Sequence, residues 1–356
     1  MKLLVVVCSL LSLTAARVIS RTVDYSNFTV ALVRAPPANY PYPPPSESWQ
    51  GQTYDLNATV DLGIRYIKQA ALNGANLVAF PELWFPGYLF DGPAGPNEQL
   101  TYYLEQALVV GSAQWDRLVA AAREYHVWLE FGFSQRDGDH VFMAQALFDD
   151  SGEVIQLRQK LRPSGGERTV FSDGTIDELK VFQTPFGRLG MLECWDTDDR
   201  CRRHMHPTMT IPVQAQNENL HIAAFPWAPD LGAMTGLTST EVSLAGARYY
   251  AVTGQTYVLM PAVGTAVVIH PNGTIVAQLN ASDCPLAQPL LYYSLNTTGF
   301  AGTLDNNING EFSWAALQQI NDAYPSYIPH EQGTFIPRRL ISVEEMKKSG
   351  PIPVNY

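Results

Sequence analysis

The chain has little positive charge. Its 356 residues include 23 lysine and arginine residues against 34 aspartate and glutamate residues, which gives a formal net charge of −11. Nucleic acids and anionic membranes favour a basic face on the proteins that bind them. We therefore expect neither a nucleic acid nor a membrane as a partner. The hydrophobic content of 46% is, however, ample for a well-buried core.

Long apolar runs are also scarce. Only residues 3–13 form such a run, between a lysine at position 2 and small residues that end at Ala16. The run is too short to span a bilayer, and a basic start followed by an apolar stretch and small residues is typical of a secretory signal peptide. We expect residues 1–16 to be a signal peptide cleaved near Ala16, and the mature chain to be secreted.

Cysteine is sparse for a secreted chain. Cys8 would leave with the signal peptide, so Cys194, Cys201 and Cys284 remain. An odd number of cysteines in an oxidising compartment points to a free thiol. One arrangement pairs Cys201 with Cys284 and leaves Cys194 free. The sequence leaves this pairing open, because it does not give the separation of the Cα atoms.

Five N-glycosylation sequons are consistent with export. Roughly two would occur by chance in a chain of this composition, so the set carries more weight than any one sequon. We expect glycosylation among the sequon asparagines, which are Asn27, Asn57, Asn272, Asn280 and Asn296.

Segments with the hydrophobic period of a strand alternate with segments that have the period of a helix. Alternation of this kind, interrupted by hairpin turns, predicts a layered α/β domain over residues 17–298. Residues 299–356 lack a clear pattern, and we expect a partly irregular C-terminal extension that takes part in oligomer contacts. The predicted strands are residues 28–34, 76–80, 127–133, 141–148, 154–159, 179–182, 189–192, 221–225, 257–260, 265–270 and 274–279, and the predicted helices are residues 56–73, 111–125, 207–216 and 239–253.

Four residues with reactive side chains follow predicted strands or turns. Cys194 sits at a strand-to-loop turn that suits a nucleophilic thiolate, although an unpaired cysteine is more often a small core residue. Glu82 follows a buried strand among aromatic residues, and it is either a desolvated general base or an exposed loop carboxylate. Lys160 is either a catalytic ammonium or part of a solvated basic face. Glu167 follows two glycines and is either a site residue or a surface partner of Arg168.

The order and spacing of these residues resemble the nitrilase family of carbon–nitrogen hydrolases. The resemblance rests on Phe-Pro-Glu at Glu82, on the run Lys-Leu-Arg-Pro-Ser-Gly-Gly-Glu-Arg that starts at Lys160, and on Leu-Glu-Cys-Trp-Asp around Cys194. It extends from the strand at Phe28 to the strand near Leu291. The resemblance implies an α/β fold, the four-layer αββα sandwich of that family, with residues 17–298 as the catalytic domain and a homodimer or higher homo-oligomer as the assembly.

The resemblance also implies the catalytic roles. Cys194 would be the nucleophile, Glu82 the general base, Lys160 the cation that stabilises developing negative charge, and Glu167 the residue that positions the lysine and the substrate. The expected reaction converts a small-molecule nitrile to a carboxylic acid and ammonia through thioimidate and thioester intermediates, without a metal or another cofactor. An amidase or a cyanide hydratase is the alternative. A catalytically silent family member is the second alternative, and a papain-like protease lacks its signature.

Departures from the family pattern concern the surroundings of the nucleophile. Asp196 and Thr197 stand where the family usually has Glu and then Asn or His, and Ser164-Gly-Gly replaces Thr-His-Val, which we expect to add flexibility beside Lys160. These changes put the substrate range in doubt more than the reaction.

Aromatic residues near the motifs are candidates for the substrate pocket. We expect Trp195, Tyr88 and Trp227 to line it, with core packing as the alternative. Cys201, His204 and His206 lie close together, but their spacing fits no standard zinc site, and we expect no metal there.

Overall fold

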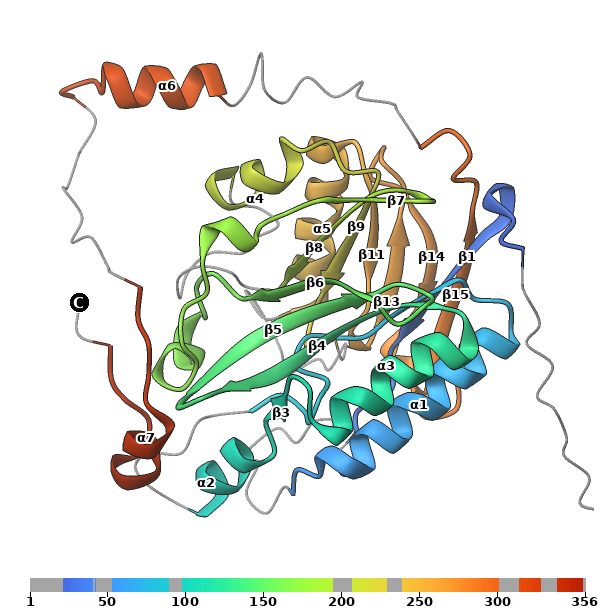
Figure 1. Ribbon diagram of the computed structural model, residues 1–356. Coiled ribbons are helices and arrows are strands. Elements are labelled where there is room, and N and C mark those ends of the chain that lie inside the picture. The colour runs from blue at the N-terminus through green and yellow to red at the C-terminus, as the bar shows by residue number, and fades with distance from the viewer. Residues whose placement is uncertain are drawn as a thin grey trace, which may run out of the picture.

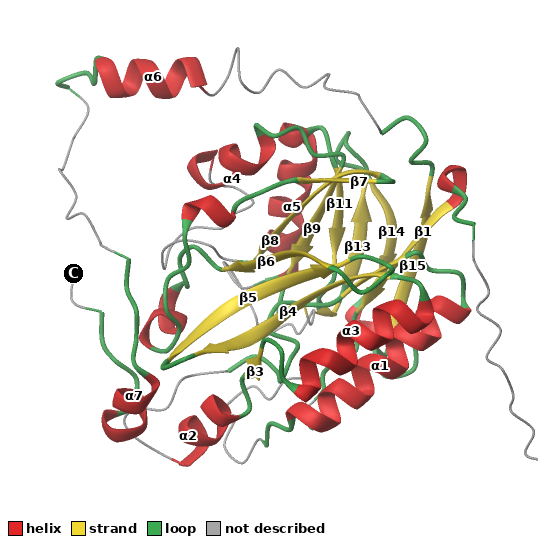
Figure 2. Cartoon of the chain, in the orientation of Figure 1, coloured by secondary structure: helices red, strands yellow, loops and turns green. Residues whose placement is uncertain are grey.

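Two β-sheets pack face to face, and helices cover the outer face of each sheet (Figures 1 and 2). The computed structural model describes residues 22–40, 42, 53–89, 98–194, 207–228, 239–300, 314–327 and 338–354. The prediction of an α/β fold with the four layers of an αββα sandwich is confirmed.

The first sheet has seven strands. Its hydrogen-bonded order is β15-β1-β2-β4-β5-β6, and β3 pairs with β4. The bounds are β1 (Phe28–Val33), β2 (Leu77–Ala79), β3 (Leu108–Val109), β4 (Trp128–Asp137), β5 (His140–Phe148), β6 (Val154–Gln159) and β15 (Leu290–Leu295).

The second sheet has six strands in the order β14-β13-β11-β9-β8-β7, and a separate two-stranded sheet pairs β10 with β12. The bounds are β7 (Phe182–Thr184), β8 (Gly187–Glu193), β9 (Leu220–Ala224), β10 (Trp227–Ala228), β11 (Tyr257–Met260), β12 (Val263–Gly264), β13 (Ala266–Ile269) and β14 (Ile275–Leu279).

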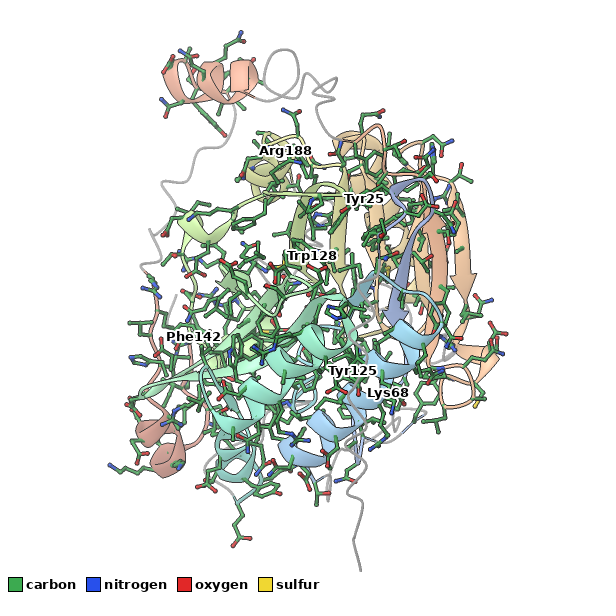
Figure 3. All side chains as sticks on the ribbon, turned by 45° about the vertical axis from the view of Figure 1, so that its right-hand side comes forward. Tyr25, Lys68, Tyr125, Trp128, Phe142 and Arg188 are labelled. Atoms are coloured by element: carbon green, nitrogen blue, oxygen red, sulfur yellow. The ribbon has the colours of Figure 1, made fainter. Side chains whose placement is uncertain are left out.

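Helices α1 and α3 lie side by side on the first sheet, and α5 covers the second sheet (Figure 1). Lys68 on α1 is exposed, whereas Trp128 packs edge-on against Phe186 between the sheets (Figure 3). The bounds are α1 (Leu56–Leu72), α2 (Glu98–Glu105), α3 (Ala113–Tyr125), α4 (Pro207–Gln214), α5 (Thr240–Gly254), α6 (Trp314–Asp322) and α7 (Val343–Ser349).

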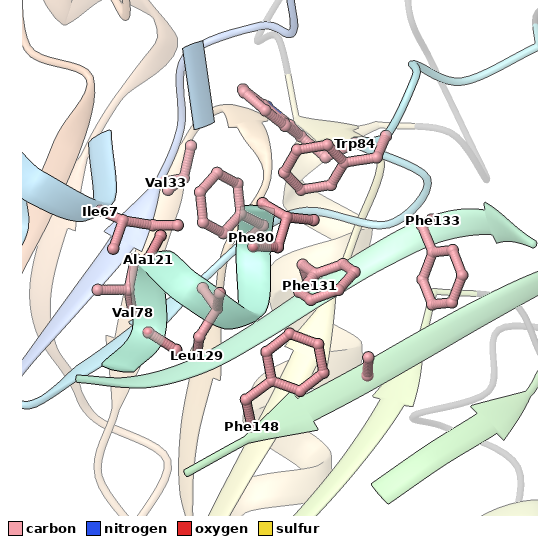
Figure 4. Packing of buried hydrophobic residues seen from close by; sticks show 14 of the residues in the cluster. Val33, Ile67, Val78, Phe80, Trp84, Ala121, Leu129, Phe131, Phe133 and Phe148 are labelled. Atoms are coloured by element: carbon pink, nitrogen blue, oxygen red, sulfur yellow. The ribbon is translucent and has the colours of Figure 1, made fainter. Parts of the chain in front are cut away.

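Because side chains alternate between the two faces of a strand, the first sheet contributes to two different buried layers. On β4, Leu129, Phe131 and Phe133 point into the aromatic layer under α1 and α3 (Figure 4). Successive side chains of a strand point to opposite faces, so Glu130 points toward the second sheet. Most side chains of the middle layer are apolar, for example Leu77 and Met191. The buried polar side chains of this layer therefore stand out against an apolar background.

Most predicted elements agree with the observed ones. The exceptions are the predicted strand at residues 179–182, where a 3₁₀ turn (Ile176–Glu178) precedes β7, and the C-terminal extension, which contains α6 and α7. Cys284 is exposed and forms no disulfide with any described residue, and its suggested pairing with Cys201 stays a prediction. Cys201 itself and the predicted signal peptide lie outside the described residues. Within the described ranges, every helix is too short or too polar to cross a membrane.

Candidate active site

The four candidate catalytic residues all follow strands or turns at one end of the sandwich. Glu82 comes shortly after β2, Lys160 directly after β6, and Cys194 directly after β8. Glu167 lies in a 3₁₀ helix (Gly165–Thr169) that follows Lys160 along the chain. Strand ends fix backbone positions well, because the sheets behind them are hydrogen-bonded and packed on both faces.

Contacts within the group join all four residues. The ammonium Nζ of Lys160 donates to Glu82 Oε1 and to Glu167 Oε2, each at 3.0 Å. The backbone N–H of Cys194 donates to the other oxygen of Glu82, Oε2, at 2.6 Å. The Sγ atom of Cys194 is separated from that nitrogen by only Cα and Cβ. Glu82 therefore connects the lysine of one sheet to the cysteine of the other.

Burial decides between the readings that the sequence left open. The exposed fraction is 2% for Glu82 and 0% for Lys160, so neither is an exposed loop carboxylate or a solvated basic residue. Cys194 forms no disulfide with any described residue, and its exposed fraction is 8%. The positive charge of a buried ammonium is compensated by the negative charges of two adjacent carboxylates. Burying any one of these three charges alone would carry a large desolvation penalty.

The two carboxylates beside Lys160 differ in pKa. Burial raises the pKa of Glu82, and the favourable contacts with Lys160 and the Cys194 N–H do not cancel that effect. Burial also acts on Glu167, but Lys160 and the donors from Ser164 and Tyr88 outweigh it and lower the pKa of that carboxyl. Paired acids whose environments push their pKa values apart commonly have different roles. Glu82 is suited to accept a proton, and Glu167 is suited to remain an anion.

Ser164 and Tyr88 hold Glu167 in place. The Ser164 backbone N–H donates to Glu167 Oε2 at 2.8 Å as part of a capping box for the 3₁₀ helix, and the Ser164 hydroxyl donates to the same oxygen at 3.1 Å. Tyr88 donates its hydroxyl to Glu167 Oε1 at 2.6 Å. Burial raises the pKa of Tyr88 well above its usual range, so the hydroxyl keeps its proton. The run Ser164-Gly-Gly-Glu thus forms a hydrogen-bonded turn, and the flexibility expected from its two glycines stays a prediction.

The structure describes two of the three aromatic residues that we expected to line the substrate pocket. The rings of Tyr88 and Trp227 face each other with centroids 6.2 Å apart, and both side chains are half-buried. Tyr88 thus contacts both Glu167 and Trp227. Trp195 lies outside the described residues, as do Asp196 and Thr197.

Metal ligands were not expected at this site. Within the described part of the chain, His, Cys, Asp and Glu side chains form no group of three or more that could hold a metal ion. Cys201, His204 and His206 lie outside that part.

Gly132 on β4 allows the Glu82 segment to approach the sheet. A Cβ atom at position 132 would lie 2.7 Å from Glu82 Cα and 2.7 Å from the carbonyl oxygen of Pro81. Both neighbours are backbone atoms, so they could yield only if the segment moved. The sequence gives no signal for this role, because it depends on a contact between segments about 50 residues apart.

We expect the Gly132→Ala variant to displace Glu82 and to lower the turnover of the site by roughly 10- to 100-fold, because small misplacements of catalytic groups have effects of that size. Overpacking should also lower the free energy of unfolding by about 1–3 kcal/mol. Enzyme assay and urea unfolding measure the two effects. Gly299→Ala is the control, since its Cβ would meet nothing within 4 Å. Full turnover in Gly132→Ala would contradict the role.

Glu193, which precedes Cys194, is a buried acid that the sequence analysis did not assign to the site. Its exposed fraction is 0%, and neither carboxyl oxygen has a hydrogen-bond partner among the described residues. By alternation along β8 it faces the first sheet, where Arg158 donates to Gln145 and Gln145 donates to Glu130. Burial, reinforced by the charge of Glu82, raises the pKa of Glu193 to about 8.

This raised pKa predicts a pH-dependent effect of the Glu193→Gln substitution. An unperturbed glutamate ionises near pH 4.5, whereas folded Glu193 keeps its proton up to about pH 8. Between these values the folded state binds more protons than the unfolded state, so the contribution of Glu193 to stability falls as the pH rises. Glutamine does not titrate. We expect the variant to gain stability relative to the native protein from pH 5 to pH 8, by up to roughly a few kcal/mol.

Urea unfolding at several pH values between 5 and 8 measures this difference. The exposed residue Glu153 supplies the control variant, Glu153→Gln. A difference between native protein and Glu193→Gln that stays constant across this range would show that Glu193 ionises as it does in the unfolded chain.

Comparison with known proteins identifies the family. The sequence pattern described as Carbon-nitrogen hydrolase matches residues 29–283. The chain therefore belongs to the carbon–nitrogen hydrolase family. It is 39% identical over 211 residues to a nitrilase from Pseudomonas syringae pv. syringae (strain B728a), a match that covers 58% of this chain and 61% of the relative.

A second relative is an aliphatic nitrilase from Rhodococcus rhodochrous, which is 33% identical over 260 residues, covering 70% of this chain and 63% of the relative. The chain thus spans less than two thirds of the length of these relatives. Among solved structures, an amidase from Nesterenkonia sp. superposes with a TM-score of 0.60 at 20% identity, covering 83% of this chain and 97% of the amidase. At that identity the match shows a shared fold.

Proposed function

We propose that this protein hydrolyses a small-molecule nitrile to a carboxylic acid and ammonia. The observation that carries the proposal is the position of Glu82, whose two oxygens accept from Lys160 Nζ and from the backbone of Cys194. A cysteine in the thiol state beside a carboxylate of raised pKa is the arrangement that nucleophilic catalysis by a thiolate requires. The family relatives named as nitrilases favour the nitrile as substrate.

In the first half of the reaction, Glu82 accepts the Sγ proton of Cys194, and the thiolate adds to the nitrile carbon. The nitrile nitrogen takes up a proton, which gives a thioimidate. A water molecule then adds to the same carbon, and the C–N bond of the tetrahedral intermediate breaks. Ammonia leaves and a thioester remains on Cys194.

In the second half, another water molecule attacks the thioester. The C–S bond breaks, the carboxylic acid leaves, and the thiol of Cys194 is restored. One nitrile and two water molecules therefore give one acid and one ammonia. Lys160 stabilises the negative charge that develops on the substrate in both halves, and Glu167 holds the lysine. Glu82 can transfer protons repeatedly, because its raised pKa brings it closer to neutral pH.

Side-by-side assays of a nitrile, an amide and cyanide test the choice of substrate, with ammonia, the carboxylic acid and, for cyanide, formamide measured as products. We expect release from the nitrile, with the free acid as the second product. Release from the amide alone would make the protein an amidase, and conversion of cyanide alone would make it a cyanide hydratase. No reaction with any of the three would favour a catalytically silent family member.

We also propose that the chain is secreted and N-glycosylated. All five sequon asparagines belong to the described residues and are exposed, as a glycan requires. Expression in a eukaryotic host should deliver the protein to the medium without residues 1–16, and an N-glycosidase should reduce its mass. An intracellular product that keeps its N-terminus would overturn the proposal.

A homo-oligomer is the assembly that we propose. The outer face of α5 carries two exposed apolar side chains, Tyr249 and Val252, with exposed fractions of 43% and 44%. Exposed apolar residues that lie close together often mark a contact surface. Light scattering should give a mass of at least two chains, and Val252→Asp should reduce it. A native mass of one chain would contradict the proposal.

A further inference from the structure

The loop of residues 160–174 carries two of the four candidate catalytic residues. Lys160 stands at its start and Glu167 near its middle. The N–H of Gly174 donates to the carbonyl of Lys160 at 2.8 Å, so the two ends of the loop meet. What holds the middle of this loop therefore also determines where Glu167 lies relative to Lys160.

Asp173 is a buried anion that fixes the loop from within. Its exposed fraction is 2%. Arg162, two residues after Lys160, donates to its Oδ2 at 2.6 Å. Arg168, the residue after Glu167, lies 3.8 Å from its Oδ1. One carboxylate thus connects the neighbour of the lysine with the neighbour of the glutamate.

The C-terminal segment of residues 338–354 holds the same carboxylate from outside. The backbone N–H of Arg339 donates to Asp173 Oδ2 at 2.9 Å, and the N–H of Asp173 donates to the carbonyl of Arg339 at 2.8 Å. Ile341 N–H donates to Ser172 Oγ at 2.9 Å, and Ile352 N–H donates to the Thr169 carbonyl at 2.8 Å. These bonds run along much of the second half of the loop.

Apolar packing adds to these bonds. Ile341, Val343 and Met346 have exposed fractions of 3%, 0% and 0%. They belong to the same buried cluster as Val170 and Phe171 of the loop. Burial of three large aliphatic side chains contributes on the order of several kcal/mol, so the segment is firmly attached.

The segment is in turn attached to the first sheet. The N–H of Val343 donates to the carbonyl of Asp139 at 2.7 Å, and the Ile341 carbonyl lies 2.9 Å from His140 Nδ1. Figure 1 shows α7 beside the tip of the β4–β5 hairpin. The loop is therefore held between its own strand and a segment that is fixed to the neighbouring strands.

From this arrangement we propose that residues 338–354 act as a clamp on the loop, with Asp173 as a positioning residue that places Lys160 and Glu167 for the reaction. The link to the reaction rests on the function proposed above. Neither Asp173 nor any residue of the clamp is among the four candidate catalytic residues, so the effect is exerted through geometry. The inferred role gives the C-terminal extension a task within its own chain, in addition to the oligomer contacts expected of it.

Asp173→Asn tests the proposal in the full-length chain. Asparagine keeps the shape but removes the charge that attracts Arg162 and Arg168. We expect kcat for ammonia release to fall by roughly 10- to 100-fold, with KM changed by less than about 3-fold, because Asp173 is not among the residues expected to line the substrate pocket. Amide hydrogen exchange should become faster over residues 160–174 and 338–354 and remain unchanged in β1 and β11.

Two further variants sharpen the test. Arg339→Ala removes the donors that this side chain gives to the Arg168 and Ile352 carbonyls, and it should produce the same pattern from the clamp side. Asp61→Asn breaks an exposed aspartate–arginine pair and should change neither readout. Unchanged exchange and unchanged kcat in Asp173→Asn would overturn the proposal, and so would faster exchange spread evenly over the chain.

Hydrogen exchange needs no substrate, so it separates this inference from the proposed function. If the native protein released no ammonia but Asp173→Asn still loosened both segments selectively, the clamp would stand and the assigned reaction would fail. If the native protein were active and Asp173→Asn loosened neither segment, the reaction would stand and the clamp would fail.

Discussion

The Cys194→Ala variant is expected to release ammonia from a nitrile at less than about one thousandth of the native rate, because it lacks the thiol that forms the proposed covalent intermediate. Its fold should persist. Alanine removes only the sulfur atom from a small buried side chain, and the backbone N–H that donates to Glu82 remains. The free energy of unfolding should therefore fall by no more than about 2 kcal/mol.

A matched control is available in the same chain. Cys284 is the other free cysteine among the described residues, and it is exposed. Cys284→Ala should retain the full rate of ammonia release. Mass spectrometry of the native protein stopped during turnover should show a covalent adduct on the peptide that contains Cys194. An active Cys194→Ala variant would remove the basis of the proposed mechanism.

The second large effect is expected for Lys160→Gln. The variant loses the cation that lies 3.0 Å from both carboxylates, so Glu82 and Glu167 remain as two buried acids that repel each other. Removing one partner of a buried ionic group typically destabilises a protein by about 3–5 kcal/mol. Ammonia release should also be lost, because the cation proposed to stabilise the negative charge on the substrate is removed.

The destabilisation should depend on pH. Without Lys160 the two acids have raised pKa values in the fold and bind more protons than in the unfolded chain. Stability of the variant relative to the native protein should then decrease as the pH rises from about 5 to 8. Urea unfolding of both proteins at the two ends of that range measures the change. Lys68→Gln, at an exposed position of α1, is the control. An equal loss at both pH values would mean that one of the acids does not interact with Lys160.

The sequence predicts those parts of the candidate site that depend on a short stretch of neighbouring residues. Cys194 and Lys160 directly follow strands with a clear hydrophobic pattern, and Glu82 follows another shortly after its end. Their convergence in one site was expected from the family resemblance. The capping box of Ser164 and Glu167 also has a local signature, since Ser-x-x-Glu is its usual sequence form, but the two glycines within it suggested flexibility instead.

Contacts between distant segments could not be predicted. Arg339 and Asp173 are 166 residues apart, and α7 has only seven residues, too few for a distinct helical period. Glu193 was visible as the neighbour of Cys194, but its burial depends on the packing of β8 against the first sheet. Side-chain alternation gives two faces for a strand and does not say what covers either of them.

The contact between Glu82 and Cys194 has a consequence for inactivation by heat. Glu82 follows a strand of the first sheet and Cys194 follows a strand of the second, so the proton acceptor and the nucleophile are attached to opposite sides of the interface between the sheets. Any loosening of that interface separates the two groups before either sheet melts. We expect catalytic activity to decline on heating at temperatures where the secondary structure, followed by circular dichroism, is still intact. In this molecule the reaction rate should report the distance between the sheets.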